Sequence, residues 1–341
     1  EDENSYSRPI VPGDAHCHWY HHDPEGTQVM IVSSKRRNYI SVVFAGTDDL
    51  QTALMDANIF NTPFGSTSDD SQPYNFTNST DVRVHAGFDH AVFNNHVFTN
   101  IAARLDQLFH QHKRRRLFTT GHSLGAADAV LTAVGLANLY RRDNRKVISL
   151  NFGCPRIGNL AFREYVHHNN SNVKICRFVL GWDLVPRLPE FFEHVGHTVQ
   201  LTEGSSSYNH TTTAPTIQAY YQHWGNATLH YAGVPTGWSA TPFIWVPGAL
   251  GSHHITRYRA FLAEFDVNEW MTDFVKDDAP DILPPVDDDF YDDPPDDYNI
   301  NKWMNDIVKV DNPHALPPVD DNFDDDTDDD GDPPNDYFSD D

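Results

Sequence analysis

A serine between two glycines is the first place in this chain where the residue types could do chemistry. Residues 119–125 read Thr-Thr-Gly-His-Ser-Leu-Gly, so Ser123 lies in a G-x-S-x-G pattern. A strand is predicted directly before it, at Leu117–Thr120, and a helix directly after it, at Ala126–Tyr140. In this context the pattern predicts a tight strand-to-helix turn that presents the serine hydroxyl as a nucleophile. The amide of Leu124 would then point at an oxyanion forming on a substrate.

A serine hydroxyl is a weak nucleophile near neutral pH, so it needs a histidine as base and an acid that fixes the histidine tautomer. On a fold with this turn, the acid and then the histidine follow the serine along the chain. Asp183 comes just after a predicted strand, Val173–Leu180, in the loop at the carboxyl end of that strand. His253 and His254 lie in a loop that opens a final predicted helix, Ile255–Trp270. The residues alone leave both histidines as candidates for the base.

The spacing of apolar residues predicts the elements that must hold these side chains. Two β-branched runs joined by a short polar link have the pattern of a hairpin. Strands that alternate with helices predict an α/β fold, with a mostly parallel central sheet and helices on both faces. The region 202–250 has the composition of a long irregular insertion. The predicted strands are Val29–Ser33, Tyr39–Phe44, Leu117–Thr120, Val147–Phe152, Val173–Leu180 and Val195–Leu201, and the predicted helices are Asp48–Asn58, Phe88–His112, Ala126–Tyr140, Leu160–His167 and Ile255–Trp270.

The net charge of −25 is divided unequally along the 341 residues. Residues 277–341 hold 24 Asp and two Lys, a balance of −22, which leaves −3 for the rest of the chain. We therefore expect a polar, His-rich segment at 1–27, an α/β domain at 28–276 and a disordered Asp/Pro-rich tail at 277–341 with a repeated Leu-Pro-Pro-Val-Asp-Asp motif. Nucleic acid is not an expected partner, because binding phosphates needs clustered Lys and Arg. No run of about 18 apolar residues predicts a transmembrane segment.

The first residue and the glycosylation triplets favour the secretory route, whereas the cysteines do not decide it. The chain begins at Glu1 rather than Met, which fits a mature form with a targeting segment removed. Cys17, Cys154 and Cys176 allow at most one internal disulfide, and both a Cys154–Cys176 bridge and two buried free thiols remain open. Five N-x-S/T triplets are glycosylation acceptors in a secreted protein. They begin at Asn75, Asn78, Asn169, Asn209 and Asn226.

No metal centre or cofactor is expected. The histidines and acids within Asp14–Asp23 lack the ligand spacing of a standard zinc site, and a solvated polar terminus explains them better. The acidic tail could bind calcium weakly at many places, but it lacks the glycine and the terminal Glu of an EF-hand loop. A Ser-Asp-His mechanism needs no cofactor.

Six ordered blocks of residues between about 28 and 265 resemble the fungal-type class 3 lipases of the α/β-hydrolase superfamily. Six blocks in the family's order are far more specific than any one of them alone. The blocks are Phe44–Thr47 (F-R-G-T/S in the family), Val84–Phe88 (V-H-x-G-F), Gly121–Gly125 (G-H-S-L-G), Asn151–Asn159 (containing F-G-x-P-R-x-G-N), Asp183–Pro189 (D-x-V-P-x-L-P) and His194–Gly196 (H-V-G).

The resemblance implies a role for several residues. Ser123 would be the nucleophile and Asp183 the triad acid, while Thr47 and Leu124 would donate hydrogen bonds in the oxyanion hole. Many family members have H-S-x-x-x-Y near the end of the domain, and His253 fits that spacing to a tyrosine five residues later. We therefore predict His253 as the base. Other members place the tyrosine closer, which would favour the next histidine instead.

The resemblance also implies a function. It implies a secreted serine hydrolase that cleaves the carboxylic ester bonds of acylglycerols at an oil–water interface, a triacylglycerol lipase. A feruloyl-type esterase or a phospholipase with the same triad, and a non-catalytic binding protein of the same fold, are the alternatives. The helix near Asp49–Ala57 matches the family's lid, although an ordinary packed surface helix explains it equally well.

Two residues depart from the family's pattern. Ala45 stands where the family usually has Arg, and Asp128 lies near the start of the helix that follows Ser123. An acid in the first turn would suit the helix dipole. Neither change touches the predicted triad, and the 202–250 insertion could shape the substrate pocket.

Overall fold

A mixed sheet with five parallel strands at its centre organises the fold. The computed structural model describes residues 15–22, 27–46, 60–66, 74, 76–180, 183–203, 217–222 and 251–264. In these residues the main sheet has eight strands in the order β1-β2-β3-β6-β7-β8-β9-β10. Pairing is parallel from β3 to β9 and antiparallel at both sides. The strands are β1 (Ala15–His22), β2 (Gln28–Ser34), β3 (Tyr39–Phe44), β6 (Arg116–His122), β7 (Val147–Phe152), β8 (Val173–Leu180), β9 (His197–Glu203) and β10 (Ile217–Gln222).

The central strands are buried because both faces of the sheet are covered. All six residues of β3 are buried, as are almost all residues of β7 and β8, which is typical of parallel strands in α/β proteins. The predicted hairpin is confirmed, because β2 and β3 pair antiparallel from Val29 opposite Phe44 to Ser34 opposite Tyr39. A separate two-stranded sheet joins β4 (Asn61–Pro63) to β5 (Arg83–His85).

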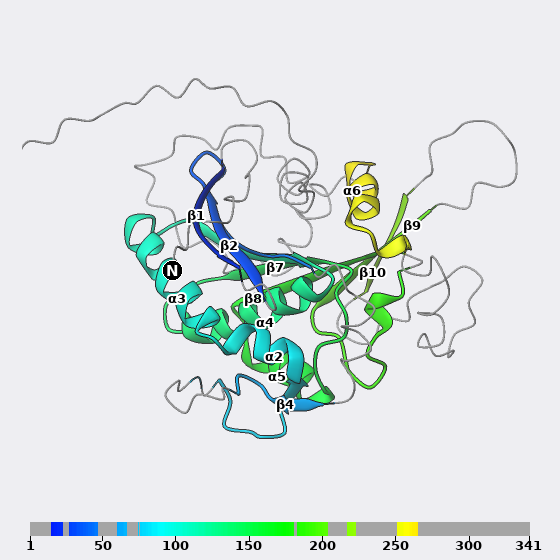
Figure 1. Cartoon of the computed structure of the whole chain (residues 1–341), viewed down its shortest axis with the longest axis horizontal. Helices are drawn as coiled ribbons and strands as arrows, with labels where there is room; N and C mark the ends of the chain where they lie inside the picture. The colour runs from blue at the N-terminus through cyan, green and yellow to red at the C-terminus, as the bar shows by residue number, and fades with distance from the viewer. Residues whose placement is uncertain are drawn as a thin grey trace, which may run out of the picture. The chain divides into compact units, whose positions relative to one another are not determined.

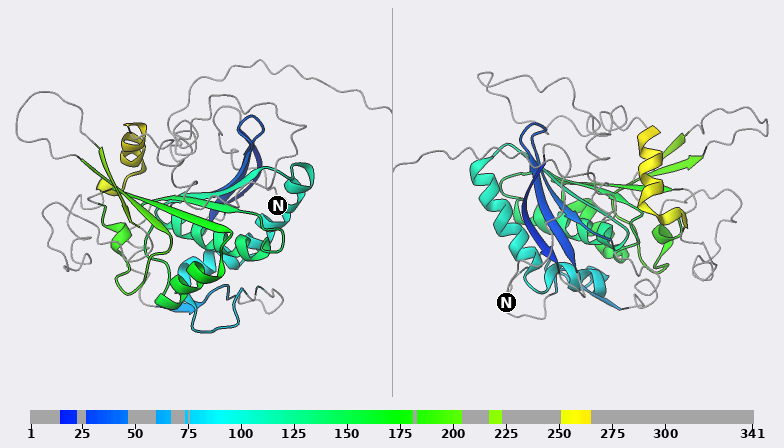
Figure 2. Two further views of the ribbon diagram at one scale, coloured as in Figure 1. Left: turned by 180° about the vertical axis from the view of Figure 1, so that it is seen from behind. Right: turned by 45° about the horizontal axis from the view of Figure 1, so that its top comes forward.

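Helices lie on both faces of the main sheet, as predicted. The helices α2, α3, α4 and α5 lie together on one side of the sheet, and α6 lies on the other side in each view (Figures 1 and 2). Each side has its own buried apolar cluster, the larger under α2–α5 and the smaller under α6. The helices are α2 (Ala86–Phe93), α3 (Val97–Gln111), α4 (Leu124–Leu139), α5 (Leu160–Asn169) and α6 (Ile255–Glu264).

The prediction of one helix over Phe88–His112 is wrong. Two helices, α2 and α3, occupy this stretch, separated by Asn95 and His96, whose φ angles of 51° and 58° are left-handed. An α-helix of L-residues does not continue through such a conformation. The apolar periodicity hides the break, because Phe93 and Val97 are buried on either side of it.

Two strands of the main sheet lie where the sequence predicted none. The edge strand β1 occupies part of the polar 1–27 segment, and its repeated histidines obscure the pattern of a strand. The strand β10 lies inside the 202–250 region that we predicted as irregular, where it pairs with β9. The first strand extends the sheet beyond the β2–β3 hairpin, and the second extends it beyond β9.

Of the two alternatives for Cys154 and Cys176, the structure shows two buried free thiols. Cys154 and Cys176 are free and fully buried, and they belong to the two different apolar clusters. The predicted lid helix near Asp49–Ala57 and the acidic tail at 277–341 lie outside the described residues. The chain divides into the units 1–311 and 312–341, and every described residue belongs to the first. Within the described ranges, no helix combines the length and apolar character needed to cross a bilayer.

The arrangement brings the ends of β6 and β8 to one edge of the sheet. These strands are parallel and are separated only by β7. Ser123 follows β6 directly and Asp183 follows β8, so both predicted site residues lie at the carboxyl edge where α/β sheets bind ligands. A mostly parallel sheet, helices on both faces and a serine on the turn between β6 and α4 make this an α/β-hydrolase fold.

Candidate active site

The turn between β6 and α4 holds Ser123 in a strained conformation. Its φ of 61° and ψ of −130° lie in a region that residues with a side chain rarely adopt. Such a conformation costs on the order of 1–3 kcal/mol and persists only where the surroundings hold it. Here the amide of Ser123 donates to the carbonyl of Phe152 on the neighbouring strand, at 3.0 Å. This hydrogen bond therefore helps to hold the strained turn, and with it the serine hydroxyl, at the end of the sheet.

Two glycines make this turn sterically possible. A Cβ at Gly121 would lie 2.2 Å from the carbonyl oxygen of Gly125, and a Cβ at Gly125 would lie 2.3 Å from that of Ala45. Both distances are far inside van der Waals contact, and the atoms approached are backbone atoms that cannot rotate away. The turn thus packs α4 directly against β6 and the end of β3. This is the physical reason for the glycines of the G-x-S-x-G pattern.

Asp183 lies in the loop after β8 and is fully buried. The loop is tightened by a hydrogen bond of 3.0 Å from the Asp183 amide to the carbonyl of Leu180. The carboxylate accepts a hydrogen bond of 2.9 Å from the amide of Val185 at Oδ1. The Oδ2 atom accepts from two side chains, described next. A buried carboxylate is stable only when its oxygens have such donors.

His253, and not His254, is brought to this carboxylate. His253 ends the short 3-10 turn Gly251–His253, and its Nδ1 lies 2.8 Å from Asp183 Oδ2. The carboxylate can only accept, so Nδ1 carries the proton and Nε2 keeps its lone pair. His253 is 4% exposed, whereas His254 is exposed and lies at the start of α6. The structure therefore pairs the histidine that we predicted as the base with the acid that we predicted as its partner.

Two polar atoms of the predicted triad have no hydrogen-bond partner among the described residues. They are Ser123 Oγ and His253 Nε2, and both are buried. A buried polar atom without a partner is costly, and a bound substrate or solvent molecule would satisfy both atoms. The backbone amide of Leu124 begins α4, where the first amides of a helix have no partner within the helix. Thr47, the other predicted oxyanion donor, lies outside the described residues.

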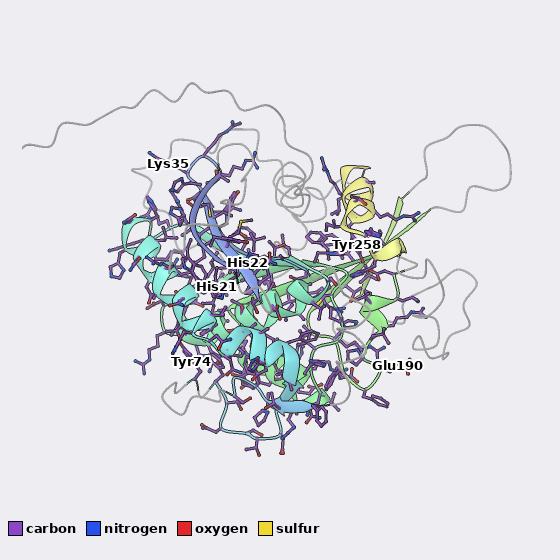
Figure 3. All side chains as sticks on the ribbon, in the orientation of Figure 1. His21, His22, Lys35, Tyr74, Glu190 and Tyr258 are labelled. Atoms are coloured by element: carbon purple, nitrogen blue, oxygen red, sulfur yellow. The ribbon has the colours of Figure 1, made fainter. Side chains whose placement is uncertain are left out.

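Sequence analysis missed part of what positions the His–Asp pair. Tyr258, on α6 (Figure 3), donates its hydroxyl proton to Asp183 Oδ2 at 2.5 Å and accepts the amide of Leu180 at 3.2 Å. Gly153, with a φ of +58°, leaves the room that the pair occupies, because a Cβ there would lie 2.7 Å from His253 Cε1 and 3.0 Å from Asp183 Oδ2. Gly153 lies in the Asn151–Asn159 block and Tyr258 lies five residues after His253, and this resemblance to the family was the only sequence signal for them.

Burial changes the protonation of several groups around the site. Burial, followed by the charge of His253, lowers the pKa of His122 to about 3, so this imidazole is neutral. His194 is also neutral, because burial lowers its pKa well below the usual value, and it donates from Nε2 to the carbonyl of Pro186 at 2.6 Å. That bond braces the loop that carries Asp183. Within the described ranges, no group of three or more His, Cys, Asp or Glu side chains is arranged to hold a metal ion.

The strand-to-helix turn that carries Ser123, the His–Asp pair and the mostly parallel sheet together define a chain of the α/β-hydrolase class. Residues 41–193 match the family model described as Lipase (class 3). This segment, which contains Ser123 and Asp183, is therefore similar to the class 3 lipase family.

Several curated proteins are similar to this chain. A lipase of Rhizomucor miehei is 28% identical over 225 residues, which are 59% of this chain and 56% of that protein. Phospholipase A1-IIdelta of Arabidopsis thaliana is 36% identical over 93 residues, 27% of this chain and 22% of that protein. A secreted mono- and diacylglycerol lipase of Malassezia restricta is 34% identical over 130 residues, 37% of this chain and 42% of that protein. The chain thus spans about half, or less, of the relatives it matches.

The fold of a solved lipase from Rhizopus microsporus var. chinensis is also similar to this chain. It is 24% identical, with a TM-score of 0.49, over 63% of this chain and 68% of that one.

Proposed function

We propose that this protein is a serine hydrolase that cleaves carboxylic ester bonds of acylglycerols, a triacylglycerol lipase. The observation that carries the proposal is the 2.8 Å contact between His253 Nδ1 and Asp183 Oδ2. Ser123 Oγ and His253 Nε2 are both buried and have no partner among the described residues. A base with a fixed tautomer and a hydroxyl on a strained turn are the two parts that ester hydrolysis through an acyl-enzyme requires.

In the first half of the reaction, His253 Nε2 takes the proton of Ser123 as the serine oxygen attacks the ester carbonyl. The oxyanion that forms is stabilised by the amide of Leu124, with Thr47 as the second proposed donor. One donor of this kind is worth about 3–4 kcal/mol in the transition state. The Asp183 carboxylate stabilises the imidazolium of His253 and keeps it in place.

The first half ends when the protonated His253 gives its proton to the leaving alcohol, and the acyl group stays on Ser123. In the second half, water enters, loses a proton to His253 Nε2 and attacks the acyl carbon. Collapse of the second tetrahedral intermediate returns the proton to Ser123 and releases the carboxylic acid. The reaction uses no metal and no cofactor in this proposal, because His253 mediates every proton transfer and Asp183 only orients and stabilises it.

Acylglycerols are the proposed substrates because the longest matches are to lipases. An oil–water interface is the proposed place of reaction. Phe60, 77% exposed, supports this, since it lies shortly after Asp49–Ala57, the residues that we assigned to a lid. A large aromatic side chain in water is the kind of group that inserts at an interface. A phospholipid substrate is the second candidate, and the Arabidopsis phospholipase relative supports it.

Removal of the serine hydroxyl is the direct test of the reaction. Ser123→Ala should lower kcat on p-nitrophenyl butyrate by about 10⁶-fold, to the level of background hydrolysis. Ser79→Ala, a change at an exposed serine of a loop, is the matched control and should keep full activity. Undiminished hydrolysis by Ser123→Ala would overturn the proposal.

A substrate panel tests the class of ester. We expect emulsified triolein to be hydrolysed faster than phosphatidylcholine vesicles or a soluble feruloyl ester, with a rise in rate once tributyrin exceeds its solubility. A preference for the vesicles, with fatty acid released from the sn-1 position, would replace the lipase with a phospholipase. A preference for the soluble ester with no interfacial rise would replace it with an esterase.

We also propose that the protein is secreted and N-glycosylated. Among the five acceptor triplets, those at Asn78 and Asn169 fall in described residues, and both asparagines are exposed. Expression through the secretory route of a eukaryotic host should give a protein whose mass falls on treatment with peptide N-glycosidase. Asn78→Gln and Asn169→Gln should each remove one glycan. An unchanged mass in both variants would contradict occupancy at these two sites.

A further inference from the structure

His122 lies between the two halves of the site. It is the last residue of β6 and is bonded in sequence to Ser123, yet its side chain reaches the C-terminal segment that carries His253. His122 Nε2 lies 2.7 Å from the backbone carbonyl oxygen of His253, across 131 residues of sequence. The two imidazole rings also face each other, with centroids 4.5 Å apart and planes inclined by 30°.

The chemistry of this contact fixes the state of the His122 ring. A backbone carbonyl only accepts hydrogen bonds, so the proton of His122 must lie on Nε2. Burial is the main reason that the ring is neutral, and the nearby His253 adds to the effect by lowering the His122 pKa further. The ring is therefore a neutral donor of defined tautomer. Its partner is the main chain of the residue that we propose as the base.

We infer that His122 is a positioning residue for His253, one that couples the place of the base to the place of Ser123. The inference rests on the proposed function. The hydrogen bond holds the main chain of the 3-10 turn Gly251–His253, and the ring contact restricts the plane of the His253 imidazole. Because His122 and Ser123 are consecutive on a rigid strand-to-helix turn, any shift of one is shared by the other. The peptide bond between His122 and Ser123 thereby ties the position of His253 to the position of the Ser123 hydroxyl.

The charge around the two rings agrees with this role. The ionisable groups that affect His122 are His253, Asp183 and His254, and Tyr258 packs edge-on against its ring at 5.7 Å between centroids. During the proposed reaction His253 becomes an imidazolium. A neutral ring 4.5 Å from it adds no repulsion, whereas a second cation there would oppose proton transfer to His253. His122 can hold the base closely because it stays uncharged.

Two substitutions separate the hydrogen bond from the ring contact. His122→Phe keeps an aromatic ring but removes the donor, whereas His122→Gln loses the ring but places an amide N–H at similar reach. If the hydrogen bond positions the base, His122→Phe should lower kcat on p-nitrophenyl butyrate about tenfold, with KM changed less than about twofold. His122→Gln should recover most of kcat. His254→Gln, next to the base but exposed, is the matched control and should behave as the native protein.

The outcomes of this experiment are distinct. A native kcat in His122→Phe, with measurable activity in the native protein, would overturn the positioning role and leave the proposed function intact. The role is also overturned if His122→Gln loses as much kcat as His122→Phe. No hydrolysis by the native protein itself would overturn the proposed function instead.

A measurement without substrate tests the same point. Nitrogen NMR of the ¹⁵N-histidine-labelled protein, with the His122 signals assigned by their loss in His122→Gln, reports the tautomer directly. We expect His122 to remain neutral with the proton on Nε2 from pH 5 to 9. Titration of His122 near its ordinary pKa, or a proton on Nδ1, would overturn the inference. Thermal unfolding of each variant by circular dichroism identifies any that fails to fold, and the native protein still gives the NMR result.

Discussion

Two buried carboxyl groups, Asp128 and Asp183, follow the serine in the sequence, and their surroundings differ completely. Asp183, in the loop after β8, is fully buried and accepts hydrogen bonds from Val185, His253 and Tyr258. Asp128, on α4, is only 7% exposed, yet its Oδ1 has no hydrogen-bond partner among the described residues. Burial alone raises the pKa of Asp128 well above its usual value. Both oxygens of Asp183 accept hydrogen bonds from protein donors, whereas Asp128 is buried with Oδ1 unpaired among the described residues.

The difference teaches that donors, and not burial, make an acid fit for a role in a site. A carboxylate surrounded by donors stays charged and can stabilise a cation beside it, which the proposed His253 imidazolium requires. A carboxyl group without donors becomes neutral or destabilises the fold. Our sequence interpretation placed Asp128 in the first turn of α4, where it would favour the helix dipole. That interpretation is wrong, because the first turn of α4 contains no acid and Asp128 is buried.

The largest expected effect comes from removing the charge of Asp183. Asp183→Asn should lower kcat on p-nitrophenyl butyrate by about 10⁴-fold, since the amide can donate to His253 Nδ1 and favours the wrong tautomer. Asp128→Asn, the same chemical change at the other buried acid, should leave kcat within about twofold. Equal losses in the two variants would break the comparison, because a general effect of burial would then explain both.

The room around the His–Asp pair is the next target. Gly153→Ala should lower kcat by about 100-fold or more, because its Cβ would displace His253 and Asp183 from contact and the residue has a φ of +58°. Gly251→Ala is the matched control on the His253 side, since a Cβ there meets nothing within 4 Å. Steady-state kinetics measure both. A native kcat in Gly153→Ala would mean that the pair does not need its present geometry.

Loss of one donor to Asp183 should have a smaller effect. Tyr258→Phe removes the hydroxyl that donates to Asp183 and leaves the buried amide of Leu180 without this acceptor. We expect kcat to fall about tenfold and the free energy of unfolding to fall by about 1–3 kcal/mol. Tyr140→Phe removes the hydroxyl of another buried tyrosine, which donates to Asp106 instead of Asp183, and should reduce stability without lowering kcat. A native kcat in Tyr258→Phe, measured in the same assay as Tyr140→Phe, would show that the hydrogen bond from Tyr258 to Asp183 does not support activity.

The smallest effect on activity, and a gain in stability, is expected at Asp128. The folded-state pKa of Asp128 is raised above its unfolded value of about 3.9. Its contribution to stability is therefore fully present below pH of about 3.9 and is lost as the pH rises through the folded pKa. Asp128→Asn should remove this loss and raise the free energy of unfolding at pH 8 by about 1–3 kcal/mol. Urea unfolding at pH 5 and pH 8 measures the change, and an identical pH dependence in variant and native protein would contradict it.

Local sequence was sufficient for the parts of the site that depend on local geometry. Ser123 and Asp183 each follow a strand directly or nearly so, and the turn around the serine is fixed by its own glycines. The base was harder, because His253 and His254 are neighbours and only the packing of the 3-10 turn decides which ring meets Asp183. The donor Tyr258 reaches Asp183 across 75 residues, a contact that no local pattern encodes.

The fold shows the same limit. Apolar periodicity predicted the central strands, because a buried parallel strand is a short continuous run of β-branched and apolar residues. It missed the break between α2 and α3 at Asn95 and His96, since Phe93 and Val97 are buried on either side of the break. It missed β1 because strand pairing with β2, and not the composition of a His-rich segment, makes those residues extended.

The separation of the base from the rest of the site has a consequence for the newly made chain. The strands β2, β3, β6, β7 and β8 end by Leu180, so the serine turn and the acid loop are synthesised well before His253, which lies 70 residues beyond Asp183. Synthesis adds roughly 5–20 residues per second, so these strands emerge before the residues that supply the base. The sheet can therefore assemble around a serine that still lacks its base. Under the proposed mechanism, a nascent chain halted before residue 251 would carry a formed turn and no hydrolytic activity, so the appearance of activity would time the docking of the 251–264 segment.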